Sequence, residues 1–402
     1  MADSDITFVQ QATRQTTLSV TYVDVTGASI AAANFVAGKK YVILVFAQMD
    51  SSVNTQSVAF RMVHGTTEFT GSVHHWEPDD GGTRHWYVFK RVWTAVTSED
   101  VKLQFRAETS NTAGADQILM LKLKLSDDFT ENTDWFDNEV ISDDTLTTTF
   151  GTKGTVTFTP ATAGDYLVIS SEEATLPDAT TQFESRLNVD GTTLEPVDEE
   201  EGRATGGPSA NGIYLQTNFR VVNLTAASHT VSSQGRTSAT AMTRHYGSIF
   251  VLRLDKFDFY SFVYTEAATA ELDTVDYNTQ IQTLAFTPAT AGDHVILGQA
   301  VFIAARTHFH KLRMQVDNVN NPTQDNVQVE SAVDALDKNT NVILTLANLT
   351  LASHTVDLDA SEEAAASNAT AEDRLILVFS KALVAAPPGV TAADNVPVGY
   401  WM

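Results

Sequence analysis

Histidine is the residue type whose spacing in this sequence comes closest to a metal site. His308 and His310 alternate, so both imidazoles would lie on one face of a strand, and His294 precedes them along the chain. Three histidines could ligate Zn²⁺. Leu312 and Met314 continue the same face, which favours residues at the edge of a β-sandwich, and we predict no bound metal. The same interpretation applies to a second histidine group, namely His74, His75 and His85.

Two acidic runs carry oxygen atoms of the kind that bind Ca²⁺. They are residues 198–202 (DEEEG) and residues 79–82 (DDGG). Neither has the alternating ligand spacing of a dedicated calcium loop, so we interpret the first as a solvated loop tip and the second as a plain turn. A chain this acidic could also pair two carboxylates for glycoside hydrolysis, but no pair stands out.

No nucleophile lies in a recognisable catalytic context. The sequence has no Gly-x-Ser-x-Gly elbow and no Ser/His/Asp arrangement of a familiar kind. It contains no cysteine, which excludes a disulfide framework and a thiolate metal site. We therefore predict a protein that is not an enzyme and that has no cofactor.

Tryptophan and basic residues are concentrated in the N-terminal third. Three of the five tryptophans, Trp76, Trp86 and Trp93, lie there. Trp, Tyr and Arg are the residue types that dominate protein interfaces. Two interpretations stay open: a partner-binding surface that includes Trp76, Arg84 and Trp86, or a core that contains Trp86 and Phe89. The same cluster includes Tyr87, Lys90 and Arg91.

The C-terminal segment, residues 385–402, is an apolar tail that ends in Tyr400, Trp401 and Met402. Such an end is usually disordered or captured by a partner. Because exposing this aromatic end to water would be unfavourable, we predict that a partner binds the tail, with Tyr400 and Trp401 as the partner contacts.

These residues must be positioned by a chain in which two motifs recur in order. Residues 158–166 (FTPATAGDY) match residues 286–294 (FTPATAGDH) at all but the last position. Residues 223–231 (NLTAASHTV) match residues 348–356 (NLTLASHTV) at all but one. The separation of roughly 125 residues is a usual size for one domain and too long for a solenoid unit. The chain therefore contains a duplicated domain.

A third, diverged copy comes first. Residues 35–44 (FVAGKKYVIL) have the pattern of the strand that starts at Gly164. Every copy closes on an apolar strand, at residues 118–125, 249–254 and 375–379. We predict first, second and third repeats at residues 1–128, 129–258 and 259–384, with the tail at 385–402.

The local pattern is β almost throughout. Residues 155–159 (TVTFT) alternate as a half-buried strand does, and residues 160–165 contain turn residues. Gly164 and Gly292 would permit the tight return, and we predict a positive φ at Gly164 or in its immediate turn. Residues 186–189 followed by Asp190-Gly191 indicate a hairpin. The fold class is all-β, with three tandem jelly-roll-type β-sandwich domains and a short extended C-terminal tail.

The net charge of −25 excludes some partners. A surface this acidic repels phosphate backbones, so we predict no nucleic-acid partner. No apolar run is long enough for a membrane-spanning helix, and the N-terminus lacks the pattern of a signal peptide. The first repeat is nearly neutral and the other two are strongly acidic, which suggests that the first repeat docks and the others face solvent.

The second and third repeats resemble the C1q/TNF-like jelly roll. The resemblance is carried by Phe158, by Gly164-Asp165-Tyr166, by the turn at residues 224–229 and by the apolar strand at 249–254. In the third repeat the tyrosine becomes His294. The first repeat lacks the Pro-Ala-Thr-Ala turn. The two repeated motifs also resemble those of tailed-phage virion proteins.

The second resemblance implies a function. The chain is expected to be a non-catalytic accessory protein of a tailed-phage virion, with decoration or cementing of the head surface preferred. It would assemble in many copies with other capsid or tail proteins, in the host cytoplasm, where a protein without cysteine is at no disadvantage. The alternative is a tail-fibre or adhesin-type module that binds carbohydrate, with Trp76 and Trp86 as stacking platforms.

Overall fold

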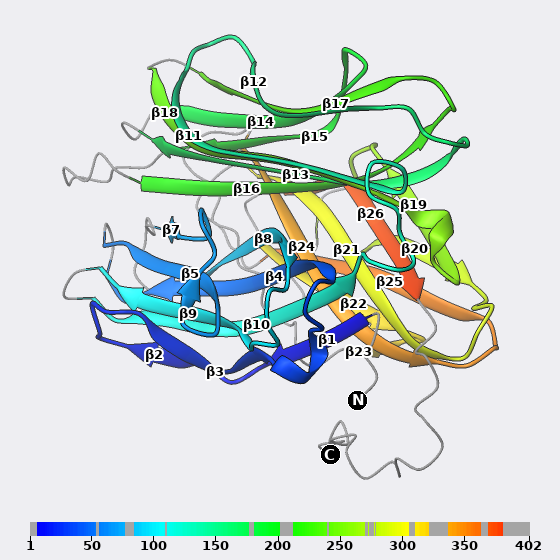
Figure 1. Cartoon of the computed structure of the whole chain (residues 1–402). Helices are drawn as coiled ribbons and strands as arrows, with labels where there is room; N and C mark the ends of the chain where they lie inside the picture. The colour runs from blue at the N-terminus through cyan, green and yellow to red at the C-terminus, as the bar shows by residue number, and fades with distance from the viewer. Residues whose placement is uncertain are drawn as a thin grey trace.

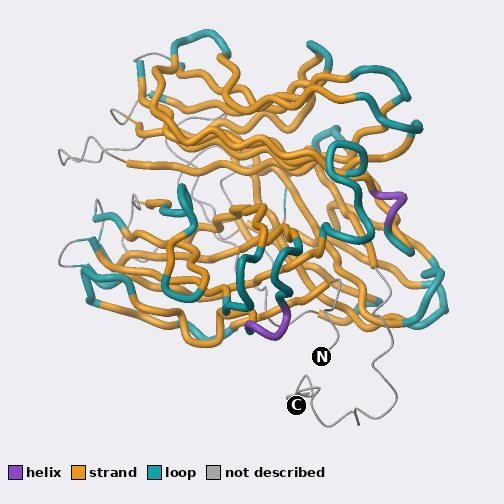
Figure 2. Tube along the Cα trace, viewed as in Figure 1, coloured by secondary structure: helices purple, strands orange, loops and turns teal. Residues whose placement is uncertain are grey.

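The computed structural model describes residues 6–53, 56–76, 84–108, 111–176, 181–201, 212–238, 241–269, 272, 277, 279–304, 310–320, 337–362 and 369–380. Within these ranges the chain is all-β, with only two short 3₁₀ helices, η1 (Ala32–Asn34) and η2 (Leu254–Lys256) (Figure 2). None of the described helices is long and apolar enough to cross a membrane. The predicted all-β class is confirmed.

The first repeat contains two five-stranded sheets. The inner sheet has the order β1-β10-β4-β8 with β2 paired to β10, and the outer sheet has the order β3-β9-β5-β6 with β7 paired to β5. The strands are β1 (Ile6–Gln11), β2 (Gln15–Thr17), β3 (Val23–Ile30), β4 (Lys40–Ser51), β5 (Val58–His64), β6 (Thr67–Glu68), β7 (His74–Trp76), β8 (Arg84–Thr94), β9 (Val101–Ala107) and β10 (Ala113–Lys124).

The second repeat contains an inner sheet of order β11-β18-β13-β16 and an outer group of order β12-β17-β14-β15. The strands are β11 (Trp135–Leu146), β12 (Gly151–Phe158), β13 (Gly164–Leu176), β14 (Gln182–Val189), β15 (Thr192–Glu201), β16 (Gly212–Leu224), β17 (His229–Thr237) and β18 (Met242–Arg253). The predicted hairpin is present at Asp190-Gly191, and both residues have positive φ, 53° and 80°.

The third repeat has the same two strand orders, β19-β26-β21-β24 and β20-β25-β22-β23. Its inner sheet joins the outer group of the second repeat through one pairing, Glu199 with Lys338. The strands are β19 (Phe259–Thr265), β20 (Thr279–Phe286), β21 (Gly292–Ala304), β22 (His310–Val316), β23 (Val319–Asn320), β24 (Asp337–Leu349), β25 (His354–Glu362) and β26 (Thr370–Ser380).

We number the strands one to eight within each repeat and leave out β2 and β7 of the first. In every repeat the inner sheet then joins strands one, eight, three and six, and the outer sheet joins strands two, seven, four and five. This is the connectivity of a jelly roll. The short extra strands β2 and β7 are additions in the first repeat. Figure 1 shows the three strand sets grouped around a common centre. The division into domains at residues 128, 258 and 384 stays a prediction, and the tail at 385–402 lies outside the described residues.

Burial explains why these sequences form two kinds of sheet. In the outer strand β12, Val156 and Phe158 are buried while the threonines beside them are exposed. One face of such a sheet meets water, so apolar and polar residues alternate. In the inner strand β4, every residue after Lys40 is buried. Both faces of the inner sheet are covered, which suits its continuous apolar sequence.

The two repeated motifs lie beside each other in both copies. Gly164 pairs with Leu224, and Gly292 pairs with Leu349 in the same way. Phe158 is opposite His229, and the equivalent residues are Phe286 and His354. The two phenylalanines are 6% and 7% exposed, and both leucines are 3% exposed. The repeated motifs therefore place the same residues at equivalent buried positions, as a duplicated domain requires.

Hydrogen bonds show why the motif residues recur. In the second repeat, His229 Nδ1 lies 2.6 Å from Asp190 Oδ2, and the Thr230 amide donates to Asp190 Oδ1 at 2.7 Å. The second ring nitrogen lies 3.1 Å from the Thr225 carbonyl oxygen. The third repeat has the same contacts in His354, Asp317, Thr355 and Thr350. The motif histidine thus joins the turn that precedes it to the neighbouring hairpin through side-chain hydrogen bonds.

The backbone at the two repeated glycines differs. Gly292 has a φ of 135°, whereas Gly164 has no positive φ and neither does any other residue of its turn. The prediction of a positive φ at Gly164 is therefore wrong. Gly164 and Gly292 each begin a strand and are paired in the same way, with Leu224 and Leu349, so the strand pairing is compatible with either backbone conformation.

This difference gives a matched pair of variants. Gly292→Val is expected to lower the free energy of unfolding by about 1 kcal/mol or more, because a β-branched residue is strained at that φ. Gly164→Val is expected to change it by less than about 0.5 kcal/mol, since its new Cβ would meet only Asp255 Oδ2 at 3.6 Å. Urea denaturation of both variants is the measurement. Equal losses would contradict the backbone assignment.

Candidate functional site: the interface between the first and second repeats

The residues predicted to bind a partner fall on two strands of the first repeat. Trp76 ends β7 opposite Val58. Arg84 and Trp86 lie at the start of β8, opposite Asp50 and Gln48. The side chains of Trp76, Arg84 and Trp86 lie outside the described part of the structure, as do Tyr400 and Trp401 altogether. Their role as partner contacts stays a prediction.

The described neighbours of these residues are buried. Tyr87 and Phe89 are 0% and 1% exposed and belong to the core between the two sheets of the first repeat. Trp93 is 9% exposed and packs edge-on against Phe35. For these three aromatic residues the core interpretation is confirmed and the docking interpretation is wrong. They alternate along β8 and so share its inward face.

The basic residues of the cluster are buried as well, and they contact the second repeat. Lys90 is 1% exposed and its Nζ binds Asp137 of β11. Arg91 is 3% exposed, and its Nη1 lies 2.7 Å from Glu139 Oε1 and 3.1 Å from the Tyr246 hydroxyl. These cations do not decorate a free surface; they attach the first repeat to the second.

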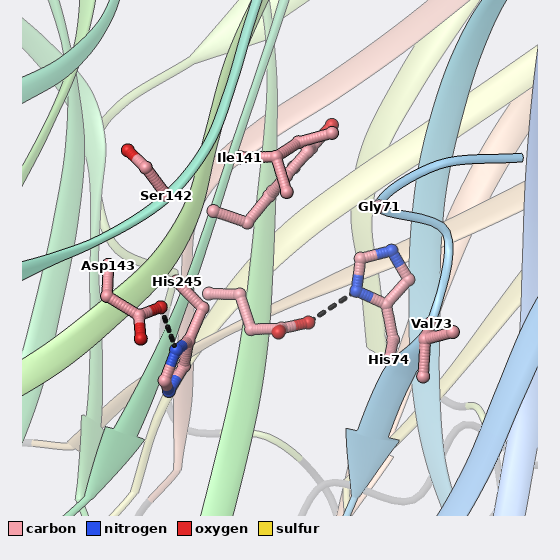
Figure 3. Close-up of a pocket in the computed structure, with 9 residues that line it drawn as sticks. Gly71, Val73, His74, Ile141, Ser142, Asp143 and His245 are labelled. Atoms are coloured by element: carbon pink, nitrogen blue, oxygen red, sulfur yellow. Dashed lines mark hydrogen bonds and ion pairs between the residues drawn. The ribbon is translucent and has the colours of Figure 1, made fainter.

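A third contact with a carboxylate lies in the same interface. His74 of β7 and Glu173 of β13 are both buried, and His74 Nδ1 binds Glu173 Oε2 (Figure 3). The other nitrogen, Nε2, is buried without a hydrogen-bond partner. At all three contacts, the basic side chain comes from the first repeat and the carboxylate from the second. The charge difference between these repeats therefore serves their mutual packing.

A cavity of about 230 Å³ lies at the edge of this interface. His74 and Gly71 line it from the first repeat, and Ile141, His245 and Glu173 are among its lining residues from the second. Figure 3 shows the two histidine–carboxylate pairs on opposite sides, the second one joining His245 Nδ1 to Asp143 Oδ1 at 2.8 Å. Within the described residues, no three His, Asp or Glu side chains are placed to hold a metal ion.

Burial changes the acidity of the groups in this interface. Burial raises the pKa of Glu139, and the nearby Arg91 and Lys90 offset only part of that rise. Burial lowers the pKa of Lys90, but Asp137, Tyr246 and Glu139 together outweigh it, so the pKa of Lys90 is raised overall. Buried cations and carboxylates without partners would be strongly destabilising, which ties the two repeats together.

The three inner sheets meet at one apolar centre. A small cavity of about 20 Å³ is lined by β4 and β10 of the first repeat, by β13 and β18 of the second and by Phe379 of the third. Phe46 and Phe219 stack there with ring centroids 6.0 Å apart. The apolar residues of this centre belong to one continuous cluster that includes all three repeats. This continuous apolar cluster joins the three repeats.

Side chains protect the strand edges at this centre. Strands β8, β16 and β24 contact one another. The Gln299 side chain accepts a hydrogen bond from the Phe219 amide at 2.9 Å and donates one to the Phe219 carbonyl at 3.1 Å. The Thr217 hydroxyl donates to the Val88 carbonyl at 2.6 Å. Unpaired strand edges invite aggregation, and here neighbouring repeats satisfy them.

The remaining sequence-predicted sites are placed as follows. Asp198 to Glu201 lie in β15 and pair with β14, so the loop-tip interpretation is wrong for them; the tight Asp190-Gly191 turn extends the hairpin this far. Residues 202, 79–82 and His308 lie outside the described residues. His294 is buried, its Nδ1 donates to the Gly292 carbonyl oxygen at 2.9 Å, and its ring packs edge-on against Phe259. Burial lowers its pKa.

Sequence reasoning missed the acidic half of the interface. Asp137 and Glu139 alternate in β11 and Glu173 lies in β13. The alternation at residues 137 and 139 was a signal for two carboxylates on one strand face. No signal in a single sequence shows which cations face them, because the partners lie 47 or more residues away.

Comparisons with known proteins give no family. No protein-family model matches the sequence, and no curated protein matches it. Among solved structures, the insecticidal delta-endotoxin Cry8Ea1 from Bacillus thuringiensis is similar at a TM-score of 0.22 and 10% identity, over 55% of this chain and 54% of that chain. This chain therefore matches only about half of the endotoxin.

Two viral structures are similar over nearly the whole chain. One is from Sulfolobus turreted icosahedral virus, at a TM-score of 0.20 and 10% identity, over 93% of this chain and 92% of that chain. The other describes a triple jelly-roll fold and turret assembly in an archaeal virus, at a TM-score of 0.20 and 12% identity, over 93% and 91%. At such TM-scores the likeness carries no argument about function.

Proposed function

We propose that this chain is a non-catalytic structural protein of a tailed-phage virion, and that it decorates or cements the head surface. The observation that carries the proposal is the single apolar centre shared by three jelly-roll repeats. The inner sheets and the ion pairs hold the three repeats together, and the repeated motifs hold turns within them. Such a rigid body is suited to a structural role. The resemblance of the repeated motifs to tailed-phage virion proteins supports the kind of particle.

The proposed location is the virion, reached by assembly in the host cytoplasm in many copies with capsid or tail proteins. The acidic second and third repeats would face solvent, because like-charged surfaces do not pack readily on an acidic particle. Lys90, Arg91 and His74 of the first repeat already contact carboxylates of the second, and other described cations of the first repeat, such as Arg14 and Arg61, pair within it. Attachment is therefore assigned to Trp76, Arg84, Trp86 and the tail.

A pair of variants tests this attachment. Replacing Trp76 and Trp86 together by Ala, and separately deleting residues 385–402, are each expected to lower incorporation into particles by about tenfold or more, since aromatic interface anchors typically contribute 2 kcal/mol or more. Quantitative mass spectrometry of purified particles measures incorporation, and circular dichroism checks folding. If both variants incorporate normally while changes confined to residues 259–384 abolish attachment, the orientation is the reverse.

The alternative function, carbohydrate binding by a tail-fibre or adhesin-type module, rests on the tryptophans of β7 and β8. Tyr87, Phe89 and Trp93 are buried and are not available as stacking platforms. Trp76 and Trp86 therefore stay the proposed platforms on these two strands. A glycan array with the purified full chain separates the two functions: the structural role predicts no specific hit, and a hit that is lost in the double Trp variant would favour the carbohydrate module.

A further inference from the structure

Lys90 is an unusual residue for the place that it occupies. It lies between Val88 and Val92 on the face of β8 that packs into the shared apolar centre, and it is 1% exposed. Its Nζ lies 5.7 Å from the centre of the Phe250 ring. A lysine is almost never this buried unless it has a partner. The partner is Asp137, whose side chain is 18% exposed and whose Oδ1 contacts Nζ.

A second carboxyl group stands beside this pair. Glu139 follows Asp137 by two residues in β11, so both side chains leave the same face of the strand. Glu139 interacts electrostatically with Lys90 and with Asp137. The other groups facing the cluster are Arg91, Tyr246 and His74. Burial raises the pKa of Glu139, so this carboxyl group retains a proton more readily than an exposed glutamate does.

We propose that Lys90 and Asp137 condense to form an amide bond, which cross-links β8 of the first repeat covalently to β11 of the second. Glu139 transfers the protons of this reaction. The geometry supplies the amine, the carboxyl carbon and the proton carrier in one cluster, in which Lys90 is 1% exposed and both carboxyl groups are 18% exposed, and no co-reactant is needed.

The reaction balances within the protein. One proton passes from the Lys90 ammonium to the Asp137 carboxylate, which gives a neutral amine and a neutral acid. The Nζ lone pair attacks Cγ, so a C–N bond forms. Glu139 donates a proton to the departing hydroxyl group and takes one from Nζ, the C–O bond breaks, and one water molecule leaves. Glu139 ends in the protonation state in which it began.

The surroundings favour the product. Keeping two charges buried is costly, and a neutral amide removes both. Burial acts in the same direction by favouring the uncharged amine, although Asp137, Tyr246 and Glu139 together raise the pKa of Lys90 until the amide forms. The cross-link would also close a loop between residues 90 and 137, which reduces the conformational freedom of the unfolded chain.

Mass spectrometry of the full-length protein under denaturing conditions is the test. The intact mass is expected to be lower than the sequence mass by one water molecule, and peptide mapping is expected to find a branched peptide that joins Lys90 to Asp137. A full sequence mass would overturn the proposal. So would a mass deficit without a branched peptide, for example one caused by dehydration at Asp190-Gly191.

Variants give the matched controls. Lys90→Arg is expected to restore the full mass, and Glu139→Gln is expected to let uncross-linked protein accumulate. Lys153→Arg removes a similar pair, in which Lys153 is 4% exposed and lies 2.6 Å from Asp144 Oδ1; it should leave the deficit unchanged. A deficit that persists in Lys90→Arg would overturn the assignment. If that variant does not fold, the wild-type peptide map still decides.

Discussion

Phe219→Ala is expected to lower the free energy of unfolding by about 3–5 kcal/mol, the usual cost of removing a fully buried aromatic ring. Phe219 is 0% exposed and stacks on Phe46 of the first repeat. Gln299 of the third repeat holds its backbone. The variant would leave a cavity at the point where all three repeats meet. We therefore expect the loss to affect the whole chain.

Guanidinium denaturation followed by tryptophan fluorescence and by circular dichroism measures this effect. Leu351→Ala is the control, because Leu351 is 60% exposed, and a change within about 0.5 kcal/mol is expected for it. A loss below about 1 kcal/mol in Phe219→Ala would mean that the shared centre contributes little, since cavities of this kind rarely cost so little.

The second large effect concerns pH and Glu172. Glu172 is buried, with Oε1 3.2 Å from Arg244 Nη1. Burial raises the pKa of Glu172 to about 7, although Arg244 and Ser233 act in the opposite direction. A carboxyl group with a raised pKa in the folded state binds its proton more tightly there than in the unfolded chain.

The stabilisation that this proton provides is fully present below the unfolded pKa of 4.5 and is lost as the pH rises through about 7. Between about pH 4.5 and pH 8 the wild-type protein is expected to lose about 3 kcal/mol of unfolding free energy from this group, at 1.36 kcal/mol for each pKa unit. Burial also raises the pKa values of Glu139 and Asp359, which adds to the same trend.

Urea denaturation at several pH values tests the assignment. Glu172→Gln keeps the shape and removes the titrating proton, so its stability is expected to vary much less between these two pH values. Glu266→Gln is the control, because Glu266 is 61% exposed; it should keep the wild-type profile. A Glu172→Gln protein with the wild-type pH profile would show that another group dominates.

Local patterns in the sequence were sufficient to predict much of the fold. Alternation in residues 155–159 predicted an outer strand, and the Asp190-Gly191 pair predicted a hairpin, because both signals depend on neighbouring residues. Phe158 and Phe286 have the same place in the repeated motif, and in the structure they occupy equivalent core positions. Because both copies have the same fold, a strand predicted in one copy strengthens the prediction of the equivalent strand in the other.

Local patterns in the sequence did not predict the role of side chains whose contacts lie far away along the chain. Lys90 and Arg91 were interpreted as members of a possible docking surface, yet each faces a carboxylate of another repeat. Asp190 was recognised only as a turn residue, although it also holds His229. Gly164 was expected to have a positive φ, but glycine permits that conformation without requiring it. Residues 198–201 pair with β14 because the strand after the Asp190-Gly191 turn continues that far. Their acidic composition had favoured a loop.

The central claim is that this chain is a structural component of a virion. The most direct measurement is quantitative mass spectrometry of tailed-phage particles purified from the organism that carries this sequence. The account predicts that the chain is present in the particle fraction at a fixed, multi-copy ratio to the major capsid protein and that the ratio survives repeated density-gradient purification. A chain that is abundant in the lysate and absent from the purified particles would contradict it.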